Sequence, residues 1–272
     1  ATGCIRVASM RIAVVTGANK GIGYEIAKQM LTTCTVVVLA CRNKELGEAA
    51  VKQLASPKAR FMQCDISDAA SIAAFADTFS AEVGALDVLV NNAAIAYKGA
   101  DPTPFEGQTG PTLRTNYRGT VALTERMLPL LEQSSNGHLV NIASMAGRLG
   151  QVSAERQAQF SSPTLTTEGL TALADDFAAD VAAGRHKANG WGNSNYGFSK
   201  LCVIAYTKLL ARRYAGTVLN VNCCCPGYCR TDMASNRGPR PPEVGARNAV
   251  MLADPSCALN GEFIQDERVS EW

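Results

Sequence analysis

A tyrosine and a lysine four residues apart, in Tyr196-x-x-x-Lys200, form a pair suited to acid–base chemistry. If the segment through Tyr214 is helical, the two side chains lie on one helix face. A phenol with a pKa near ~10 becomes a workable acid and base at neutral pH when a nearby cation favours its phenolate. We therefore expect Tyr196 to exchange a proton with an oxygen that becomes negative during the reaction, as a carbonyl oxygen does when a hydride reaches its carbon.

A glycine-rich turn provides a second candidate site. The segment reads Thr16-Gly17-Ala18-Asn19-Lys20-Gly21-Ile22-Gly23, after a first apolar run and before an amphipathic stretch. Gly17 permits a tight turn, Gly21 lets the backbone approach a pyrophosphate, and Gly23 allows the helix to pack closely on the strand. The helix N-terminus supplies amides and a positive dipole. The spacing differs from the common G-x-G-x-x-G and lacks the Gly-Lys-Ser/Thr of a P-loop, so the pattern predicts a dinucleotide site and excludes a P-loop.

The second apolar run, 36–40, indicates which dinucleotide binds. Enzymes that prefer NAD usually carry an acidic residue about 20 positions beyond the glycines, where it binds the ribose 2′-hydroxyl. Here no acidic residue occurs until Glu45, whereas Arg42 and Lys20 offer two cations where a 2′-phosphate would lie. We predict NADP(H), with ordinary solvated cations as the alternative interpretation of Arg42 and Lys20.

The elements that must position these groups alternate along the chain. Seven short apolar runs predict strands at 12–16, 36–40, 60–64, 86–91, 138–143, 218–225 and 262–265. Stretches with apolar residues three and four apart predict helices at 22–31, 45–54, 71–79 and 120–131. Because the central runs are continuously apolar, their strands should be buried on both faces. The fold class is therefore α/β, a Rossmann-type, doubly wound, parallel seven-stranded sheet with helices on both faces.

The domain organisation follows from the same pattern. No repeat or low-complexity linker divides the chain, so we expect a single NADP(H)-binding domain over 1–272. A Pro-rich loop at 238–242 precedes an expected helix at 243–252. Residues 150–190 interrupt the alternation with a helix-like segment at 168–183, and we interpret them as a helical insertion on the ligand side of the sheet, ahead of the Tyr196-x-x-x-Lys200 helix.

Composition narrows the possible partners. The 26 Lys and Arg nearly balance the 24 Asp and Glu, and a formal charge of +2 gives no broad field for nucleic acid or an anionic membrane. No apolar run approaches the ~20 residues needed to span a bilayer. The segment Ala1 to Met10 lacks the apolar core of a signal sequence. We expect a cytoplasmic protein with a small-molecule partner, and neither a nucleic-acid nor a membrane partner.

Cysteines and histidines do not predict a metal site. The run 223–225 and Cys229 come closest to a cluster, but adjacent residues of a strand point to opposite faces and cannot converge on one ion. We expect reduced thiols, with the last two cysteines of this run buried as small hydrophobes. His138 and His186 have no ligand at the usual spacing, so we interpret them as surface or loop histidines.

Together, the glycine turn and Tyr196-x-x-x-Lys200 resemble the motifs of the short-chain dehydrogenase/reductase family, over nearly the whole chain and in the expected order. Further matching segments are Asp65-Ile66, Asn91-Asn92-Ala93, Asn116, Ser144 and Pro226-Gly227. The chain is similar in particular to the monomeric NADPH-dependent carbonyl reductases, through Asp101-Pro102-Thr103-Pro104-Phe105, Arg230-Thr231-Asp232-Met233 and the ending Arg268-Val269-Ser270-Glu271-Trp272. One departure is Ala94, where the family most often has glycine.

The resemblance implies four catalytic residues. Tyr196 would donate the proton to the substrate oxygen, and Ser144 would orient that oxygen. Lys200 would bind the nicotinamide ribose and lower the pKa of Tyr196. Asn116 would hold a water in the proton relay.

The resemblance also implies a cofactor-binding set. Asp65 and Ile66 would flank the adenine, and Asn92 would lie beside the adenosine ribose. The segment from Pro226 to Thr231 would contact the nicotinamide. The full expected set is Gly17, Asn19, Lys20, Gly21, Ile22, Gly23, Arg42, Asp65, Ile66, Asn92, Tyr196, Lys200, Pro226, Gly227 and Thr231.

The activity implied by the resemblance is NADPH-dependent reduction of carbonyl compounds, such as quinones, ketones and aldehydes, to alcohols. Two alternatives stay open: an NADP-dependent hydroxysteroid or prostaglandin dehydrogenase on the same fold, and a non-catalytic NADPH-sensing scaffold. By resemblance, the insertion covers the helix face through which many family members dimerise, so a monomer is expected. Trp191, just before the tyrosine motif, is expected near the substrate pocket.

Overall fold

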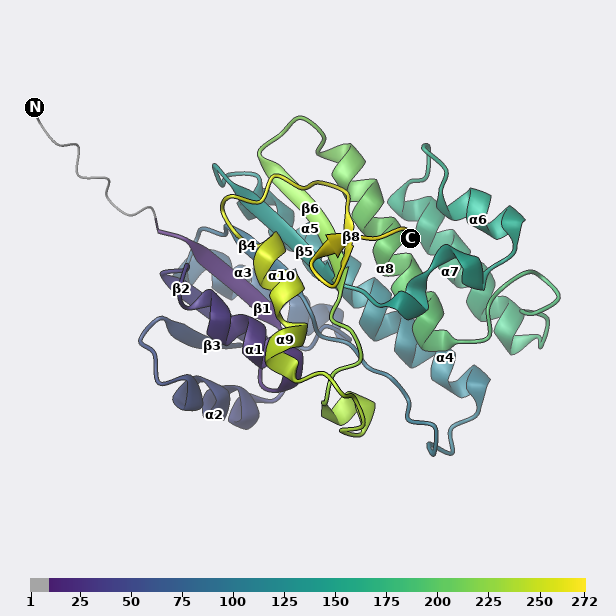
Figure 1. Cartoon of the computed structure of the whole chain (residues 1–272), viewed down its shortest axis with the longest axis horizontal. Helices are drawn as coiled ribbons and strands as arrows, with labels where there is room; N and C mark the ends of the chain where they lie inside the picture. The colour runs from purple at the N-terminus through teal and green to yellow at the C-terminus, as the bar shows by residue number, and fades with distance from the viewer. Residues whose placement is uncertain (1–9) are drawn as a thin grey trace, which may run out of the picture.

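The computed structural model describes residues 10–272 (Figure 1). Residues 1–9 lie outside this range. They make up nearly all of the segment 1–10, which is expected to lack the apolar core of a signal sequence. Eight strands form one sheet in the order β3-β2-β1-β4-β5-β6-β7-β8, parallel except for the β7–β8 pair. They are β1 (Ile12–Thr16), β2 (Val36–Cys41), β3 (Ala59–Gln63), β4 (Val88–Asn91), β5 (Gly137–Ile142), β6 (Leu219–Cys225), β7 (Phe263–Gln265) and β8 (Arg268–Val269).

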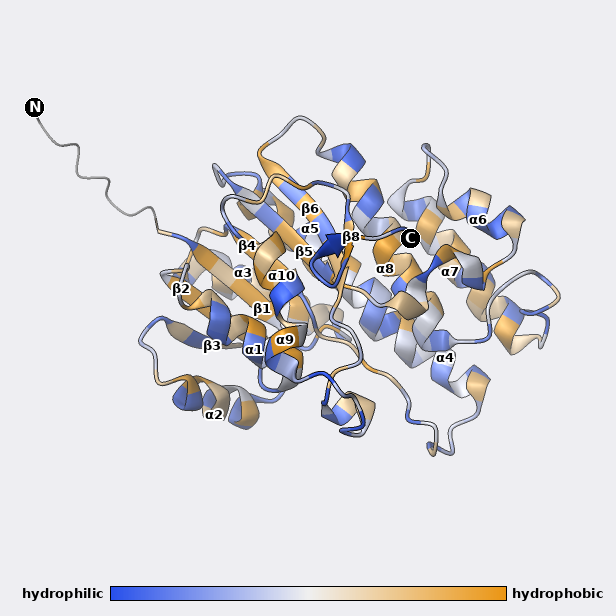
Figure 2. Ribbon diagram, viewed as in Figure 1, coloured by the Kyte–Doolittle hydropathy of each residue, from blue (hydrophilic) through white to orange (hydrophobic). Residues whose placement is uncertain are grey.

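Helices cover both faces of this sheet. They are α1 (Gly21–Met30), α2 (Lys44–Leu54), α3 (Ala69–Glu82), α4 (Phe105–Leu113), α5 (Thr120–Leu131), α6 (Ala154–Phe160), α7 (Thr167–Ala182), α8 (Asn195–Arg213), α9 (Pro242–Gly245) and α10 (Arg247–Leu252). One apolar core joins the sheet to α3, α5 and α8, and a second joins it to α1, α2 and α10. β1, which contributes to both cores, is strongly apolar, whereas the short edge strand β8 is hydrophilic (Figure 2). None of the helices in residues 10–272 is long and apolar enough to cross a membrane.

The predicted α/β fold is confirmed, and each of the seven predicted strands lies within two residues of its predicted bounds. Every residue of β1, β4 and β5 is buried, as expected for parallel strands covered on both faces. The sequence did not predict β8, because two residues are too few to show alternation. β8 pairs with β7 across a turn in which Asp266 and Glu267 have positive φ angles of 50° and 61°. The helix predicted at 243–252 is divided at Ala246 into α9 and α10.

The segment between β5 and α8 packs on the helix layer. The apolar side of α7, with Leu170, Ala174 and Phe177 fully buried, packs against α4 and α8. None of residues 150–190 lines the cleft described below, and their expected place on the ligand side of the sheet stays a prediction. The apolar stripe of α7 packs against neighbouring helices.

His138 is not a surface residue, so the interpretation of it as one was wrong. It lies in β5 with a fully buried side chain. Its Nδ1 is 2.9 Å from the carbonyl oxygen of Leu252, and its Nε2 is 2.9 Å from Oδ1 of Asn136. Burial lowers the pKa of His138 to about 4. The neutral ring thus joins β5 to the end of α10. His186 does lie in a loop, where it stacks on Phe105.

Candidate active site

A cleft of about 400 Å³ opens at the carboxyl ends of β1, β2 and β4. The chain winds in opposite directions from β1 and β4, and such a switch point is where doubly wound sheets bind ligands. Eleven of the predicted cofactor-binding residues line the cleft: Gly17, Asn19, Lys20, Gly21, Ile22, Gly23, Arg42, Asp65, Ile66, Asn92 and Thr231. The sequence therefore located most of the cleft.

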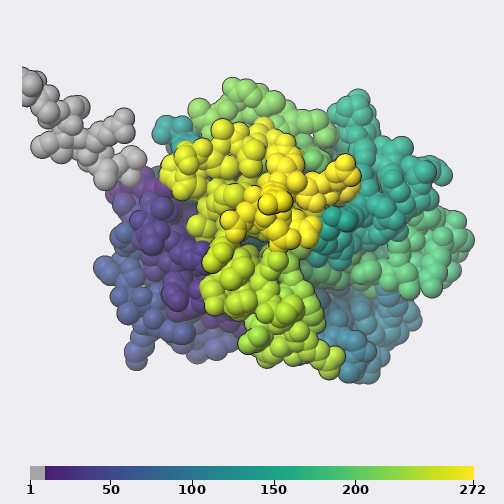
Figure 3. Space-filling view, viewed as in Figure 1, coloured from purple at the N-terminus to yellow at the C-terminus, as the bar shows by residue number. Residues whose placement is uncertain are grey.

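Arg230, which belongs to the segment from Pro226 to Thr231 expected to contact the nicotinamide, also lines the cleft. Other residues of the cleft wall were missed. They are Cys64, Ala93, Ala94, Ile95, Asp232, Met233, Asn236 and Pro242. Two signals could have found many of them. Residues 93–95 directly follow β4, and 230–236 belong to the loop after β6, which brings the late part of the chain against α1 (Figure 3).

The glycine turn is held to the end of β4 by Asn92. Its side-chain nitrogen donates to the carbonyl oxygens of Thr16, at 2.8 Å, and of Gly17, at 3.3 Å. The hydroxyl of Thr16 in turn accepts from the backbone nitrogens of Asn92 and Ala93, both at 2.9 Å. A Cβ on Gly23 would lie 2.4 Å from the Asn92 side chain, so only glycine permits this approach. The turn is fixed by protein contacts alone.

The charged end of the cleft contains an ion pair that sequence analysis did not predict. Nζ of Lys20 lies 2.7 Å from Oδ2 of Asp232, and both side chains are about three-fifths exposed. The hydrogen bond and the charge of Lys20 lower the pKa of Asp232. Arg42 lines the same cleft with an exposed side chain, and no carboxylate of residues 10–272 pairs with it. Asp232 was missed because it lies 212 positions from Lys20.

Tyr196 and Lys200 lie on the first turns of α8, whose predicted helical segment is confirmed. Ser194 caps this helix by accepting a hydrogen bond from the backbone nitrogen of Gly197. Nζ of Lys200 lies 5.7 Å from the centre of the Tyr196 ring. Lys200 is only 3% exposed, and its ammonium donates to the carbonyl oxygen of Ile142 at 2.7 Å. Burial lowers the pKa of Lys200 to about 8.

The tyrosine is a protonated acid at neutral pH. Burial, with a smaller contribution from the nearby Cys225 thiol, raises the pKa of Tyr196 to about 12, and a hydrogen bond with Ser144 opposes this shift. Ser144 lies two residues after the end of β5 and caps a short helical turn. Lys200 is expected to lower the pKa of Tyr196, and in this structure its ammonium donates to the carbonyl oxygen of Ile142.

Asn116 links the cleft to α8. It lies in a single turn of π-helix, Arg114–Gly119, between α4 and α5, and is 1% exposed. Such turns occur frequently at functional sites. Its side chain accepts from the backbone nitrogen of Ile95 at 2.8 Å and donates to the carbonyl oxygen of the same residue at 2.9 Å. It also donates to the hydroxyl of Ser199 at 3.0 Å. Asn116 thus fixes Ile95 of the cleft wall relative to the residue before Lys200.

Pro226 and Gly227 form the turn after β6. Neither lines the cleft, although Thr231 of the same segment does. The turn begins at Cys225, whose thiol is close enough to affect the pKa of Tyr196 and Lys200. Cys224 and Cys225 are 0% and 4% exposed, which confirms that they are buried as small hydrophobes.

Trp191 does not line this cleft, and its expected place near the substrate pocket stays a prediction. It is 4% exposed and packs edge-on against Phe160, Phe177 and Phe198. Its indole nitrogen donates to Oδ2 of Asp180 at 2.8 Å. Both the apolar ring and its single donor are therefore satisfied inside the helix layer.

Comparison with known families agrees with this arrangement. A family described as short chain dehydrogenase matches residues 11–182 and 180–241. The chain belongs to the short chain dehydrogenase family. The pig (Sus scrofa) protein named carbonyl reductase (NADPH) 1 is 43% identical over 274 residues, covering 96% of this chain and 94% of the relative. The human (Homo sapiens) protein of that name is 40% identical over 275 residues, covering 97% and 99%.

Solved structures of the short chain dehydrogenase fold also match. Salutaridine reductase from Papaver somniferum is similar with a TM-score of 0.84 and 31% identity, covering 93% of this chain and 99% of the other. Menthone neomenthol reductase from Mentha piperita gives a TM-score of 0.78 and 28% identity, covering 94% and 98%.

Proposed function

We propose that this protein uses NADPH to reduce carbonyl groups of small molecules, such as quinones, ketones and aldehydes, to alcohols. The observation that carries the proposal is the placement of Tyr196 on the same helix as the buried ammonium of Lys200, a helix that Asn116 joins through Ser199 to the wall of the cleft. Relatives named carbonyl reductase (NADPH) 1, at about 40% identity over nearly the full chain, support it.

The cleft fits NADP(H). The glycine turn and the N-terminus of α1 can bind a pyrophosphate with backbone amides. Lys20 and Arg42 offer positive charge to a 2′-phosphate, and Asp65 and Ile66 line the wall proposed for the adenine. The segment containing Pro226, Gly227 and Thr231 is assigned to the nicotinamide. When bound, the cofactor supplies a hydride.

The residues around Tyr196 supply the proton. As negative charge develops on the carbonyl oxygen, Tyr196 would transfer its phenolic proton to that oxygen, which completes the alcohol. The Ser144 hydroxyl, which lowers the pKa of the phenol, would orient the same oxygen. Lys200, whose pKa of about 8 leaves it mostly protonated at neutral pH, would stabilise the phenolate that remains and would bind the nicotinamide ribose. Asn116 would hold the water through which the proton is replaced.

We also propose that the chain is a cytoplasmic monomer with one domain over 1–272. A single sheet containing strands from residue 12 to residue 269 supports one domain. The packing of α7 over α4 and α8 supports a monomer, since it covers helix surface that a second subunit would need. Nine unpaired cysteines in the described residues, eight of them buried, fit a reducing compartment.

Turnover measurements test the activity. The loss of NADPH absorbance would be followed with a quinone, a cyclic diketone and an aliphatic aldehyde, and again with NADH. Tyr196→Phe is expected to abolish turnover, whereas Tyr214→Phe, which removes a phenol hydroxyl at the other end of α8, should retain it. NADPH binding without turnover of any carbonyl would favour the sensing scaffold. A clear preference for hydroxysteroids or prostaglandins would favour the dehydrogenase alternative. A preference for NADH would contradict the cofactor assignment.

A further inference from the structure

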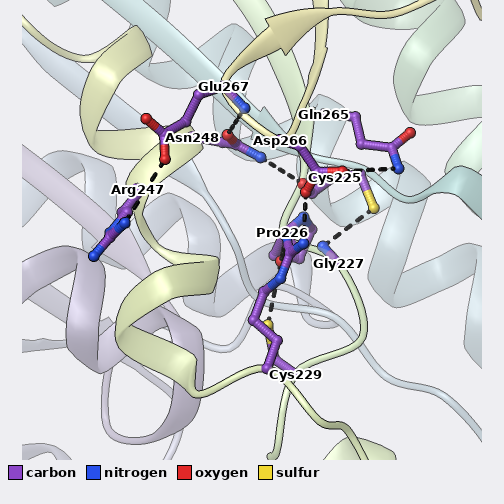
Figure 4. A network of polar contacts seen from close by, with 10 residues as sticks. Cys225, Pro226, Gly227, Cys229, Arg247, Asn248, Gln265, Asp266 and Glu267 are labelled. Atoms are coloured by element: carbon purple, nitrogen blue, oxygen red, sulfur yellow. Dashed lines mark hydrogen bonds and ion pairs between the residues drawn. The ribbon is translucent and has the colours of Figure 1, made fainter.

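The backbone turn after β6 is held by side chains that do not line the cleft. The carbonyl oxygen of Cys225 accepts a hydrogen bond from Nδ2 of Asn248 at 2.7 Å. The next carbonyl oxygen, that of Pro226, accepts from the guanidinium of Arg240 at 3.1 Å and from the thiol of Cys229 at 3.2 Å. Figure 4 shows both carbonyls and their donors. Two successive peptide groups are therefore fixed in orientation from outside the cleft.

Asn248 is a buried bridge between three segments. It belongs to α10, is 3% exposed, and uses both ends of its amide. While Nδ2 donates to Cys225, Oδ1 accepts from the backbone nitrogen of Glu267 at 2.8 Å. The bridge therefore joins the end of β6 to the turn between β7 and β8. Removing a buried amide of this kind leaves both backbone partners without a hydrogen bond.

Arg240 forms a second bridge to the same β7–β8 turn. Its guanidinium bonds Asp266 as well as the carbonyl oxygen of Pro226. It also lies directly on the backbone of Gly227, where φ is +79° and an added Cβ would come within 2.5 Å of the guanidinium nitrogen. The backbone of Arg240 pairs with the strand that leaves the turn, donating to Tyr228 and accepting from Arg230. Arg240 thus fixes the turn on two sides.

The turn held in this way connects the catalytic groups to the cleft. Its first residue, Cys225, is the last residue of β6, which packs against α8, the helix that contains Tyr196 and Lys200. Its continuation reaches Thr231, which lines the cleft and lies against Gly21 of the glycine turn. A shift of the turn would therefore change the space between Tyr196 and the bound cofactor more than it would change the adenosine end of the cleft near Arg42, which belongs to a different segment.

We propose that Asn248 and Arg240 are positioning residues for the nicotinamide half of the cofactor site. They act through the carbonyl groups of Cys225 and Pro226, which they tie to the turn at Asp266–Glu267. The inference rests on the proposed function, because it assumes that the turn contacts the nicotinamide. Under this proposal, residues outside the cleft set the distance between the nicotinamide, which donates the hydride, and Tyr196.

Two ligands distinguish binding at the nicotinamide half of the site from binding at the adenosine half. NADPH occupies both, whereas adenosine 2′,5′-bisphosphate has the adenosine and the 2′-phosphate but no nicotinamide. In the purified full chain, Asn248→Ala should raise the dissociation constant of NADPH about tenfold, with a similar fall in kcat, because buried partners lose their hydrogen bonds. Arg240→Gln should act in the same direction. The dissociation constant of the bisphosphate should stay within about twofold of the wild-type value, since its contacts lie elsewhere.

Arg247→Gln is the matched control. Arg247 precedes Asn248 and pairs with Glu267 at 3.9 Å, but both side chains are more than half exposed and neither touches the Cys225–Pro226 carbonyls. It should leave both dissociation constants and kcat unchanged, and thermal unfolding recorded for each variant shows whether it is folded. If Asn248→Ala does not fold, Arg240→Gln decides the question.

The ratio of the dissociation constant of NADPH to that of adenosine 2′,5′-bisphosphate is the deciding quantity. An unchanged ratio in the folded variants, with wild-type protein that binds and turns over NADPH, would overturn the positioning role and leave the proposed function intact. A wild-type protein that binds the bisphosphate but neither binds nor turns over NADPH would overturn both. A ratio that rises in Asn248→Ala and Arg240→Gln, but not in Arg247→Gln, supports the inference.

Discussion

Replacing Asp232 by asparagine should tighten the binding of NADPH and leave that of NADH nearly unchanged. Lys20 and Asp232 form an ion pair at 2.7 Å in the cleft that also contains Arg42. A 2′-phosphate entering this cleft must share Lys20 with the carboxylate and approach a like charge. NADH has no such phosphate. Asp232→Asn keeps the shape of the side chain while removing its charge, so it isolates this competition.

The expected gain is small, because the pair is exposed. The side chains of Lys20 and Asp232 are 62% and 61% exposed, and solvent and salt screen such pairs strongly. We therefore expect the dissociation constant of NADPH to fall by about two- to fivefold at low ionic strength, and by less at high salt. A larger gain would require a buried carboxylate, which Asp232 is not.

Fluorescence titration of NADPH and NADH at two ionic strengths would measure the effect. Asp175→Asn is the matched control, since Asp175 is equally exposed, pairs with Arg118, and does not line the cleft. Equal changes for both nucleotides would refute competition for Lys20. Weaker binding of NADPH to Asp232→Asn would refute it more directly, because the carboxylate would then assist binding.

Three further outcomes are expected. Arg42→Ala should raise the KM for NADPH about tenfold with little effect on the KM for NADH, since only NADPH loses a phosphate contact. The kcat for carbonyl reduction should fall as the pH rises through about 8, where Lys200 loses its charge, and Lys200→Arg, if active, should lack this fall. The folded-state pKa of His138, about 4, lies below the ordinary value of 6.5, so the folded protein binds fewer protons than the unfolded chain in this range. Stability should therefore decline from pH 6.5 to pH 4, by at most about 3 kcal/mol, and His138→Gln should remove that part of the decline.

A specific result would contradict each of these three predictions. Equal effects of Arg42→Ala on both nucleotides would show that Arg42 does not recognise the 2′-phosphate. A kcat that is constant from pH 7 to pH 10 would show that the charge on Lys200 does not limit the reaction. For His138, chemical denaturation at several pH values gives the slope, and an unchanged slope in His138→Gln would assign the decline to other groups.

Local sequence pattern predicted the sheet and one wall of the site. Buried parallel strands such as β1 and β4 are apolar on both faces, so each could be recognised as a continuous apolar run in the sequence. The glycine turn comes immediately after β1 in the chain. Tyr196 and the lysine proposed to act with it could be named together because they lie four residues apart on one helix. In these cases the residues that form the sequence pattern lie within a few positions of the structural feature that the pattern predicts.

The features that could not be predicted depend on contacts between distant segments. Asp232 meets Lys20 only when the loop after β6 folds over α1. His138 has polar ring atoms that suggest exposure, but the carbonyl oxygen of Leu252 provides the partner that makes its burial possible. Nothing near these residues in the sequence identifies such partners.

The β7–β8 hairpin is the last part of the sheet to leave the ribosome. A nascent chain that has reached residue 250 already contains the glycine turn, Tyr196 and Lys200, but the anchors at Asp266 and Glu267 have not yet been made. Until the hairpin docks beside β6, Asn248 and Arg240 lack their far partners and the turn at Pro226 is tied from one side only. The adenosine half of the cleft can therefore form during synthesis, whereas the half next to Tyr196 is completed only after the chain has passed residue 267.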